Sequence, residues 1–145
     1  DGKDFVANCT DKFDVIISDS TDPIGPGEVL FTSDFYADEK KCLNEGGIMV
    51  AQNGVPFMQG DEVTNTYQRL SKLYNEASFY VMPVPTYAGG FMTLAWATDD
   101  ESLRKQSAEQ IQARYDAAGI ETRYYNPEVH VASFALPNYV KVLMK

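Results

Sequence analysis

The feature that most constrains the fold is a pair of short apolar runs separated by a segment long enough for a helix. Residues 13–18 read FDVIIS, a β-branched run that ends at a cluster of turn-forming residues, and residues 48–52 read IMVAQ. The first run is typical of a buried parallel strand as it leaves a sheet. We therefore expect a strand–helix–strand unit, with the loop that follows residue 18 at the carboxyl edge of the sheet.

Helix signals fill the segments between and after these two strands. Thr32 or Ser33 can cap a helix that continues to about Leu43, and Gly46-Gly47 would end it. Asp61 can cap a second helix. In the residues that follow Asp61, apolar side chains recur at three- and four-residue intervals, as in a helix with one buried face. The stripe that this second helix would bury consists of Val63, Tyr67, Leu70 and Tyr74.

Two further strands are expected at residues 79–84 and 91–97. The segment between them is too short for a helical crossover, so this pair should be antiparallel. A third helix is expected to start at Asp99 or Asp100 and to stop at Gly119, and Asn126-Pro127 is typical of a cap followed by the first residue of another helix. The pattern predicts an α/β fold, half of a doubly wound sheet that is mostly parallel with an antiparallel strand.

Composition narrows the class of protein. The chain has 145 residues and 44% apolar content, enough for one domain or part of one, and it opens without Met as a piece of a longer protein would. A net charge of −9 disfavours nucleic-acid binding, and no apolar run approaches the ~20 residues that a membrane helix needs. Cys9, Cys42 and a single histidine, His130, cannot assemble a structural zinc site, so we expect a reduced, cytoplasmic protein without a metal.

Two carboxylates leave the carboxyl end of the first predicted strand together. Asp19 and Asp22 are three residues apart on a loop that contains Pro23 and Pro26. Three residues span at most ~10 Å, so carboxylates at this spacing can address both ends of a short diamine. The alternative is that both aspartates only form side-chain turns, which is common before proline and which the spacing alone favours.

The wider pattern resembles a known family. Residues 19–26 read DSTDPIGP and closely match the active-site loop of spermidine synthases, the polyamine aminopropyltransferase family. The resemblance continues through VAQN at 50–53, PTYAGG at 85–90, YYNPEVH at 124–130 and FALP at 134–137, and so covers essentially the whole chain. It implies that residues 1–145 form the C-terminal half of a Rossmann-like, methyltransferase-type catalytic domain. The family's small N-terminal β-domain and glycine-rich nucleotide loop would precede Asp1.

The same resemblance implies roles for individual residues. The family's catalytic aspartate, which holds and deprotonates the attacking amine, falls on Asp19. The positions implied to bind the diamine substrate are Asp22, Gln52 and Tyr87. The positions implied to bind the adenosyl group of the co-substrate are Asp1, Gly2 and Pro26. His130 and the aromatic residues Trp96, Tyr124, Tyr125 and Phe134 are expected to be structural.

The implied reaction transfers the aminopropyl group of decarboxylated S-adenosylmethionine to putrescine and yields spermidine and methylthioadenosine. It needs no metal or other cofactor, because the sulfonium co-substrate already carries its leaving group. The resemblance also implies a homodimer, and the 145 residues alone are expected to be inactive. An S-adenosylmethionine-dependent methyltransferase and a non-catalytic polyamine-binding module are the alternatives. The preference among putrescine, cadaverine and longer amines is left open.

Overall fold

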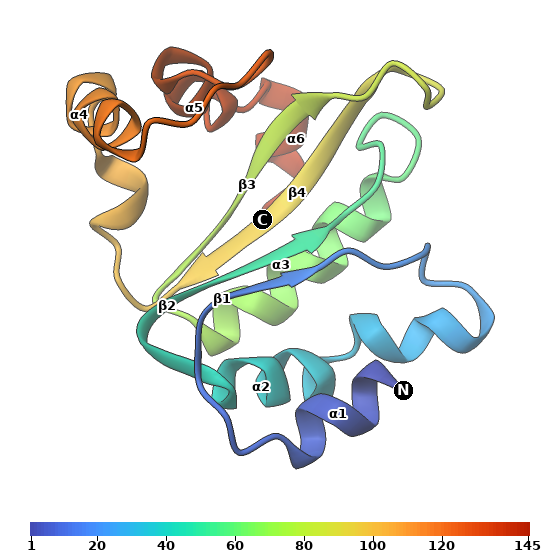
Figure 1. Cartoon of the computed structure of the whole chain (residues 1–145). Coiled ribbons are helices and arrows are strands. Elements are labelled where there is room, and N and C mark those ends of the chain that lie inside the picture. Colours follow the sequence, from blue (N-terminus) through green and yellow to red (C-terminus); the bar gives the residue numbers. More distant parts are fainter.

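The computed structural model describes residues 1–145 and contains one four-stranded sheet between helices (Figure 1). The strands are β1 (Phe13–Ser18), β2 (Leu43–Gln52), β3 (Glu76–Pro83) and β4 (Phe91–Thr98), in the spatial order β1-β2-β4-β3. β1 is parallel to β2, while β4 is antiparallel to both β2 and β3. Three strands thus run in one direction and β4 runs against them, which confirms the predicted mixed sheet.

The helices form two groups. The first group, α1 to α3 with α6, lies on one face of the sheet, and α4 and α5 lie over the other (Figure 1). The helices are α1 (Gly2–Asn8), α2 (Ser33–Lys41), α3 (Gly60–Leu73), α4 (Ala108–Ala118), α5 (Pro127–Ser133) and α6 (Asn138–Leu143), with short 3₁₀ helices η1 (Gly25–Phe31) and η2 (Leu103–Lys105). Sequence reasoning did not predict α1, η1 or α6.

The core lies between the sheet and the helices of the first group. Met49, Phe79 and Ala95 on the strands are fully buried against Val63 and Leu70 of α3. The predicted stripe of α3 is therefore confirmed at its buried positions. This packing fixes α3 against β3 and β4, and so helps to position the loop that joins these two strands.

The end of α2 was predicted wrongly. The helix ends at Lys41, capped at Thr32 as predicted, and Gly46-Gly47 lie inside β2. Gly46 has φ +71°, and a Cβ on Gly47 would lie 3.0 Å from the carbonyl oxygen of Asn44. The strand register also shifts here, between residues 13 and 15 of β1. The two glycines therefore admit a bulge in the sheet, and they do not cap a helix.

Two predicted helix starts also differ. α3 begins at Gly60 with Gln59 at its N-cap, so Asp61 lies in the first turn. The third helix does not start at Asp99 or Asp100, because the Asp100 carboxylate closes a tight turn by accepting hydrogen bonds from Ser102. The helix α4 begins after Ser107, which forms a capping box with Gln110. Its end at Gly119 and the Asn126 cap of α5 are confirmed.

β1 is an exposed edge strand within these 145 residues, although its composition is typical of a buried strand. Val15 is 49% exposed and Ile17 is 70% exposed. Only β2 pairs with β1, and α5 packs on β3 at the opposite edge of the sheet. The apolar composition of the strand therefore does not reflect burial within these 145 residues.

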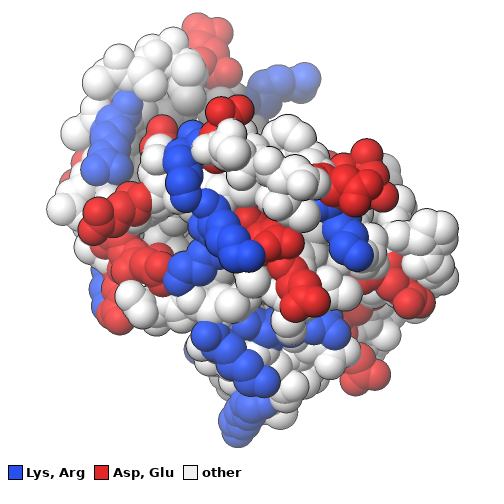
Figure 2. Space-filling model, turned by 90° about the horizontal axis from the view of Figure 1, so that it is seen from below, with Lys and Arg blue, Asp and Glu red and all other residues white.

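The charged side chains are mixed on the face seen from below, where α1 and α2 lie. Figure 2 shows acidic and basic residues interspersed there, so the net charge of −9 is not gathered into a single-sign patch on that face. None of the helices combines the length and the apolar character needed to cross a bilayer.

Candidate active site

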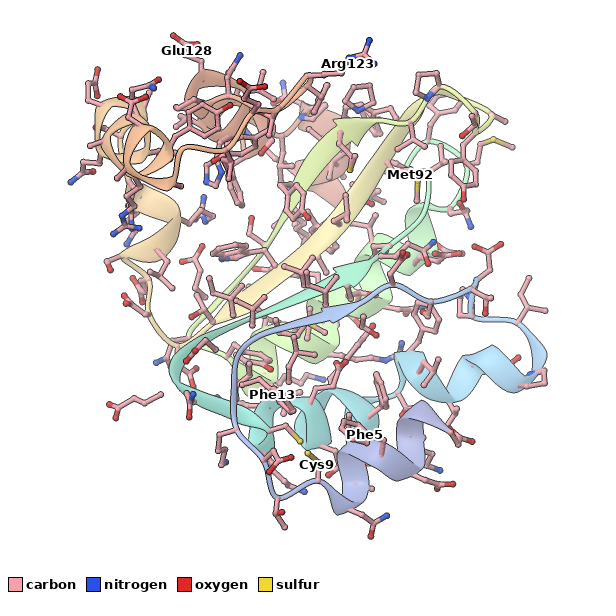
Figure 3. The ribbon with its side chains drawn as sticks, viewed as in Figure 1. Phe5, Cys9, Phe13, Met92, Arg123 and Glu128 are labelled. Carbon is pink, nitrogen blue, oxygen red and sulfur yellow. The ribbon has the colours of Figure 1, made fainter.

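A cavity of about 510 Å³ lies at the carboxyl ends of β1 and β2, beside the loop that joins β3 to β4. Its polar lining includes Asp19, Asp22, Gln52 and Tyr87, four positions that the sequence singled out. Figure 3 marks this end of the sheet by Met92, which also lines the cavity, whereas Phe13 marks the other end of β1. The structure thus brings together all the predicted catalytic and diamine-binding residues.

Strand direction explains why these residues meet. β1, β2 and β3 run in the same direction, so their carboxyl ends lie at the same end of the sheet. The segments that follow these three strands therefore lie close together. Tyr87 lies in the hairpin that follows β3, where its N–H donates to the Val84 carbonyl at 3.0 Å. The hairpin then turns through Gly89 and Gly90, which have φ of +90° and +62°. These conformations favour glycine and return the chain into β4.

The loop after β1 folds back tightly on itself. The Ile24 N–H donates to the Asp22 carbonyl at 2.7 Å, and a Cβ on Gly27 would lie 2.7 Å from Thr21 Oγ1. These turn contacts use backbone and threonine atoms, and they do not use the carboxylates of Asp19 and Asp22. Neither aspartate takes part in an ion pair in the structure. Both aspartates are exposed at the cavity. The two carboxylates are therefore free to bind a ligand.

The remaining lining of the cavity is largely apolar. Its apolar residues are Ile17, Val50, Met82, Met92 and Leu94, and its other members are Ser18, Ser20 and Thr21. Sequence reasoning did not identify this wall, although Met82 and Met92 are cross-strand partners beside the predicted hairpin. Carboxylates, an amide and a phenol against such a wall suit a short aliphatic cation, because its charged ends and its methylene chain need different surroundings.

The predicted adenosyl-binding residues form a separate group. The Asp1 carboxylate caps α1 by accepting from the Lys3 N–H at 2.9 Å, and Gly2 lies against Leu30 of η1. Pro26 is in the first turn of η1. None of the three predicted residues lines the acidic cavity. They belong instead to α1 and to η1, two elements that contact each other, and η1 continues the Asp19–Asp22 loop.

His130 lies away from the carboxylates. Its Nδ1 is 3.2 Å from the Tyr125 hydroxyl, and burial lowers the pKa of the imidazole. The ring lines two cavities under α4 and α5, neither of which contains Asp19. Of the aromatic residues expected to be structural, Trp96 is buried, whereas Tyr124 is 54% exposed.

Comparison with known proteins decides the family. Residues 1–107 match the family model of the spermine/spermidine synthase domain. The chain belongs to this family. Among its curated relatives, the polyamine aminopropyltransferases of Salmonella arizonae and Salmonella schwarzengrund are 58% and 59% identical over 140 residues. These matches cover 97% of the chain and 49% of each relative, so the chain spans about half the length of the family members it matches.

Solved structures agree with this assignment. A spermidine synthase in complex with the transition-state analogue AdoDATO superimposes with a TM-score of 0.86 at 36% identity, covering 99% of this chain and 48% of that one. The Thermotoga maritima spermidine synthase gives 0.82 at 32% identity, covering 99% and 47%. Human methyltransferase-like protein 13 gives 0.56 at 13% identity, covering 95% and 58%, which shows a shared fold alone.

Proposed function

We propose that the full-length protein carrying this chain transfers the aminopropyl group of decarboxylated S-adenosylmethionine to putrescine, giving spermidine and methylthioadenosine. The observation that carries the proposal is one cavity that gathers Asp19, Asp22, Gln52 and Tyr87 without a paired cation. Membership of the spermine/spermidine synthase family supports it. In this proposal the 145 residues are part of the catalytic domain and are inactive alone.

Asp19 has the central chemical role. An alkylammonium with a pKa of ~10.4 is almost fully protonated at neutral pH, so putrescine must lose a proton before it attacks. Asp19 holds this nitrogen and accepts its proton, while Asp22, Gln52 and Tyr87 hold the far end of the diamine. The nitrogen lone pair then forms a C–N bond to the aminopropyl carbon. The C–S bond breaks at the same time, and sulfur leaves as the neutral thioether.

The nucleoside end of the co-substrate is assigned to α1 and η1. Asp1 would accept from the adenine amino group, Gly2 would leave room beside it, and Pro26 would pack on the ring. The support is that Gly2 of α1 lies against Leu30 of η1, and that η1, which contains Pro26, continues the loop that carries Asp19. No metal or other cofactor takes part in the proposed step, because the sulfonium already supplies the leaving group.

The deciding experiment supplies the full-length protein with decarboxylated S-adenosylmethionine and a panel of putrescine, cadaverine and spermidine. Mass spectrometry then quantifies methylthioadenosine and the amine products. Spermidine from putrescine is expected. If no amine gives methylthioadenosine, the proposal is wrong. Methyl transfer from S-adenosylmethionine would then favour the methyltransferase alternative, and putrescine binding without turnover would favour a binding module.

Tyr87→Phe is expected to raise KM for putrescine about 3- to 10-fold with little change in kcat. The variant loses one hydroxyl hydrogen bond to the substrate, and such a bond contributes about 1 kcal/mol. Tyr139→Phe is the matched control, because Tyr139 is also exposed but lies on α6. Initial rates at varied putrescine measure both constants. An unchanged KM in Tyr87→Phe would remove this residue from the substrate site.

We also propose that the protein is cytoplasmic and forms a homodimer. Support for the first point is that Cys9 and Cys42 are both free thiols, as expected in a reducing compartment. The second point rests on the family resemblance. Analytical ultracentrifugation of the full-length protein tests it, and a monomer at all concentrations would contradict it.

A further inference from the structure

Glu62, in the first turn of α3, has one buried oxygen that lacks a partner. Its Oε1 accepts from Gln59 Nε2 at 2.7 Å, and Gln59 is held in turn by the Val55 N–H, which donates to its Oε1 at 2.9 Å. Glu62 Oε2 is buried and makes no hydrogen bond. The side chain is therefore fixed on one side and has an unused acceptor on the other, which is costly unless a donor arrives.

This unused oxygen lies between the two loops that carry the predicted diamine residues. A Cβ on Gly54, two residues after Gln52, would lie 2.8 Å from Glu62 Oε2. Glu62 does not line the acidic cavity itself, but it lines a second cavity of about 350 Å³ together with Pro23, which directly follows Asp22. The carboxylate is thus adjacent both to the end of β2 and to the loop after β1.

Glu62 has no ion-pair partner in the structure. Burial raises the pKa of Glu62, and the nearby Asp22 carboxylate raises it further. No ion pair in the structure involves either residue. Arg69 lines the same cavity, but it makes no ion pair with Glu62, and its Nη1 donates instead to the Phe31 carbonyl at 2.6 Å. A cation that entered between the two carboxylates would relieve both their repulsion and the desolvation of Glu62.

We propose that Glu62 is a further specificity-determining residue of the amine site, and that its carboxylate binds the ammonium at the far end of the diamine together with Asp22. The inference rests on the proposed function, in which Asp19 holds the reacting nitrogen. Two carboxylates around the far ammonium select diamines against monoamines, because a monoamine would leave their mutual repulsion and the buried Glu62 oxygen without a compensating cation. The Gln59 contact keeps Glu62 in place for this role.

The test compares Glu62→Gln with the wild type in the full-length protein. KM for putrescine is expected to rise about 10- to 100-fold with kcat within about twofold, since one charged hydrogen bond is lost before the chemical step. The Gln side chain keeps an oxygen for the Gln59 contact, so the thermal midpoint should stay unchanged. Glu28→Gln is the matched control, because Glu28 lines the same cavity but is exposed. Its KM should equal that of the wild type.

Calorimetric titration with putrescine and with n-butylamine separates a direct contact from a structural effect. Glu62→Gln should weaken putrescine binding by the same factor as KM and leave n-butylamine binding unchanged. Equal losses for both amines, or a putrescine affinity within twofold of the wild type, would overturn the inference while leaving turnover by the wild type intact. If the wild type binds putrescine but makes no spermidine, the proposed function fails, and the titration still decides the role of Glu62.

Discussion

Asp19→Asn is expected to lower kcat for aminopropyl transfer about a thousandfold in the full-length protein. The amide has nearly the same shape as the carboxylate but carries no charge and accepts no proton at neutral pH. General-base catalysis of this kind contributes about 10²- to 10⁴-fold. Methylthioadenosine release, followed by mass spectrometry over a long incubation, measures the residual rate. Because Asp19 is exposed at the cavity, folding should not change.

Asp11→Asn is the control for this variant. Asp11 is also an exposed aspartate, and it lies in the turn before β1, at the end of the strand away from the cavity. Its kcat should match that of the wild type. Full activity in Asp19→Asn, with an unchanged thermal midpoint, would mean that a different group or solvent takes the proton.

The second large effect is a loss of stability at high pH that depends on Glu39. This residue of α2 is 2% exposed, and burial raises the pKa of its carboxyl from 4.5 to about 8. Between these values the folded chain holds a proton that the unfolded chain has lost, so stability falls as pH rises. The contribution is complete below about pH 4.5 and is lost above about pH 8, and its size is on the order of 5 kcal/mol.

Glu39→Gln should remove this dependence, because the amide stays neutral at every pH. Urea unfolding at pH 5 and at pH 8.5 is expected to show a loss of stability for the wild type that the variant largely lacks. At the higher pH the variant should therefore be the more stable protein. Glu45→Gln, at an exposed position in β2, should behave as the wild type does. Parallel pH profiles for wild type and Glu39→Gln would show that Glu39 ionises in the folded chain at its ordinary pKa.

The residues that line the site were predicted from the sequence more accurately than the first and last residues of the helices and strands. A β-branched run followed by Asp, Pro and Gly predicts a strand and then a loop. The direction of the strand decides at which end of the sheet that loop lies. The segments that carry Asp19, Gln52 and Tyr87 therefore meet as expected. Gly46-Gly47 led to a wrong helix end, because a pair of glycines is compatible both with the end of a helix and with a bulge in a strand. Only the pairing of β2 with β1 shows that these two glycines form a bulge.

The burial of Glu62 and Glu39 could not be predicted from the pattern of residues along the chain. Glu62 is typical of the first turn of a helix, where an acidic residue needs no further reason. Its unused oxygen becomes evident only when α3 packs beneath Gly54 and beside the Asp22 loop. Glu39 similarly lies on a helix with low apolar content, and its burial follows from the packing of α2 on the sheet. Such features depend on contacts between elements that are distant in sequence.

The open edge of β1 has a consequence for handling the 145 residues as an isolated protein. Val15 and Ile17 project from a strand that offers a row of free N–H and carbonyl groups. A β-branched segment without proline or lysine is a template on which strands of other molecules can assemble into aggregates. Ile17→Lys would place a positive charge on β1 of every molecule that joins such an aggregate. The substitution should therefore keep the isolated chain in solution at a higher concentration.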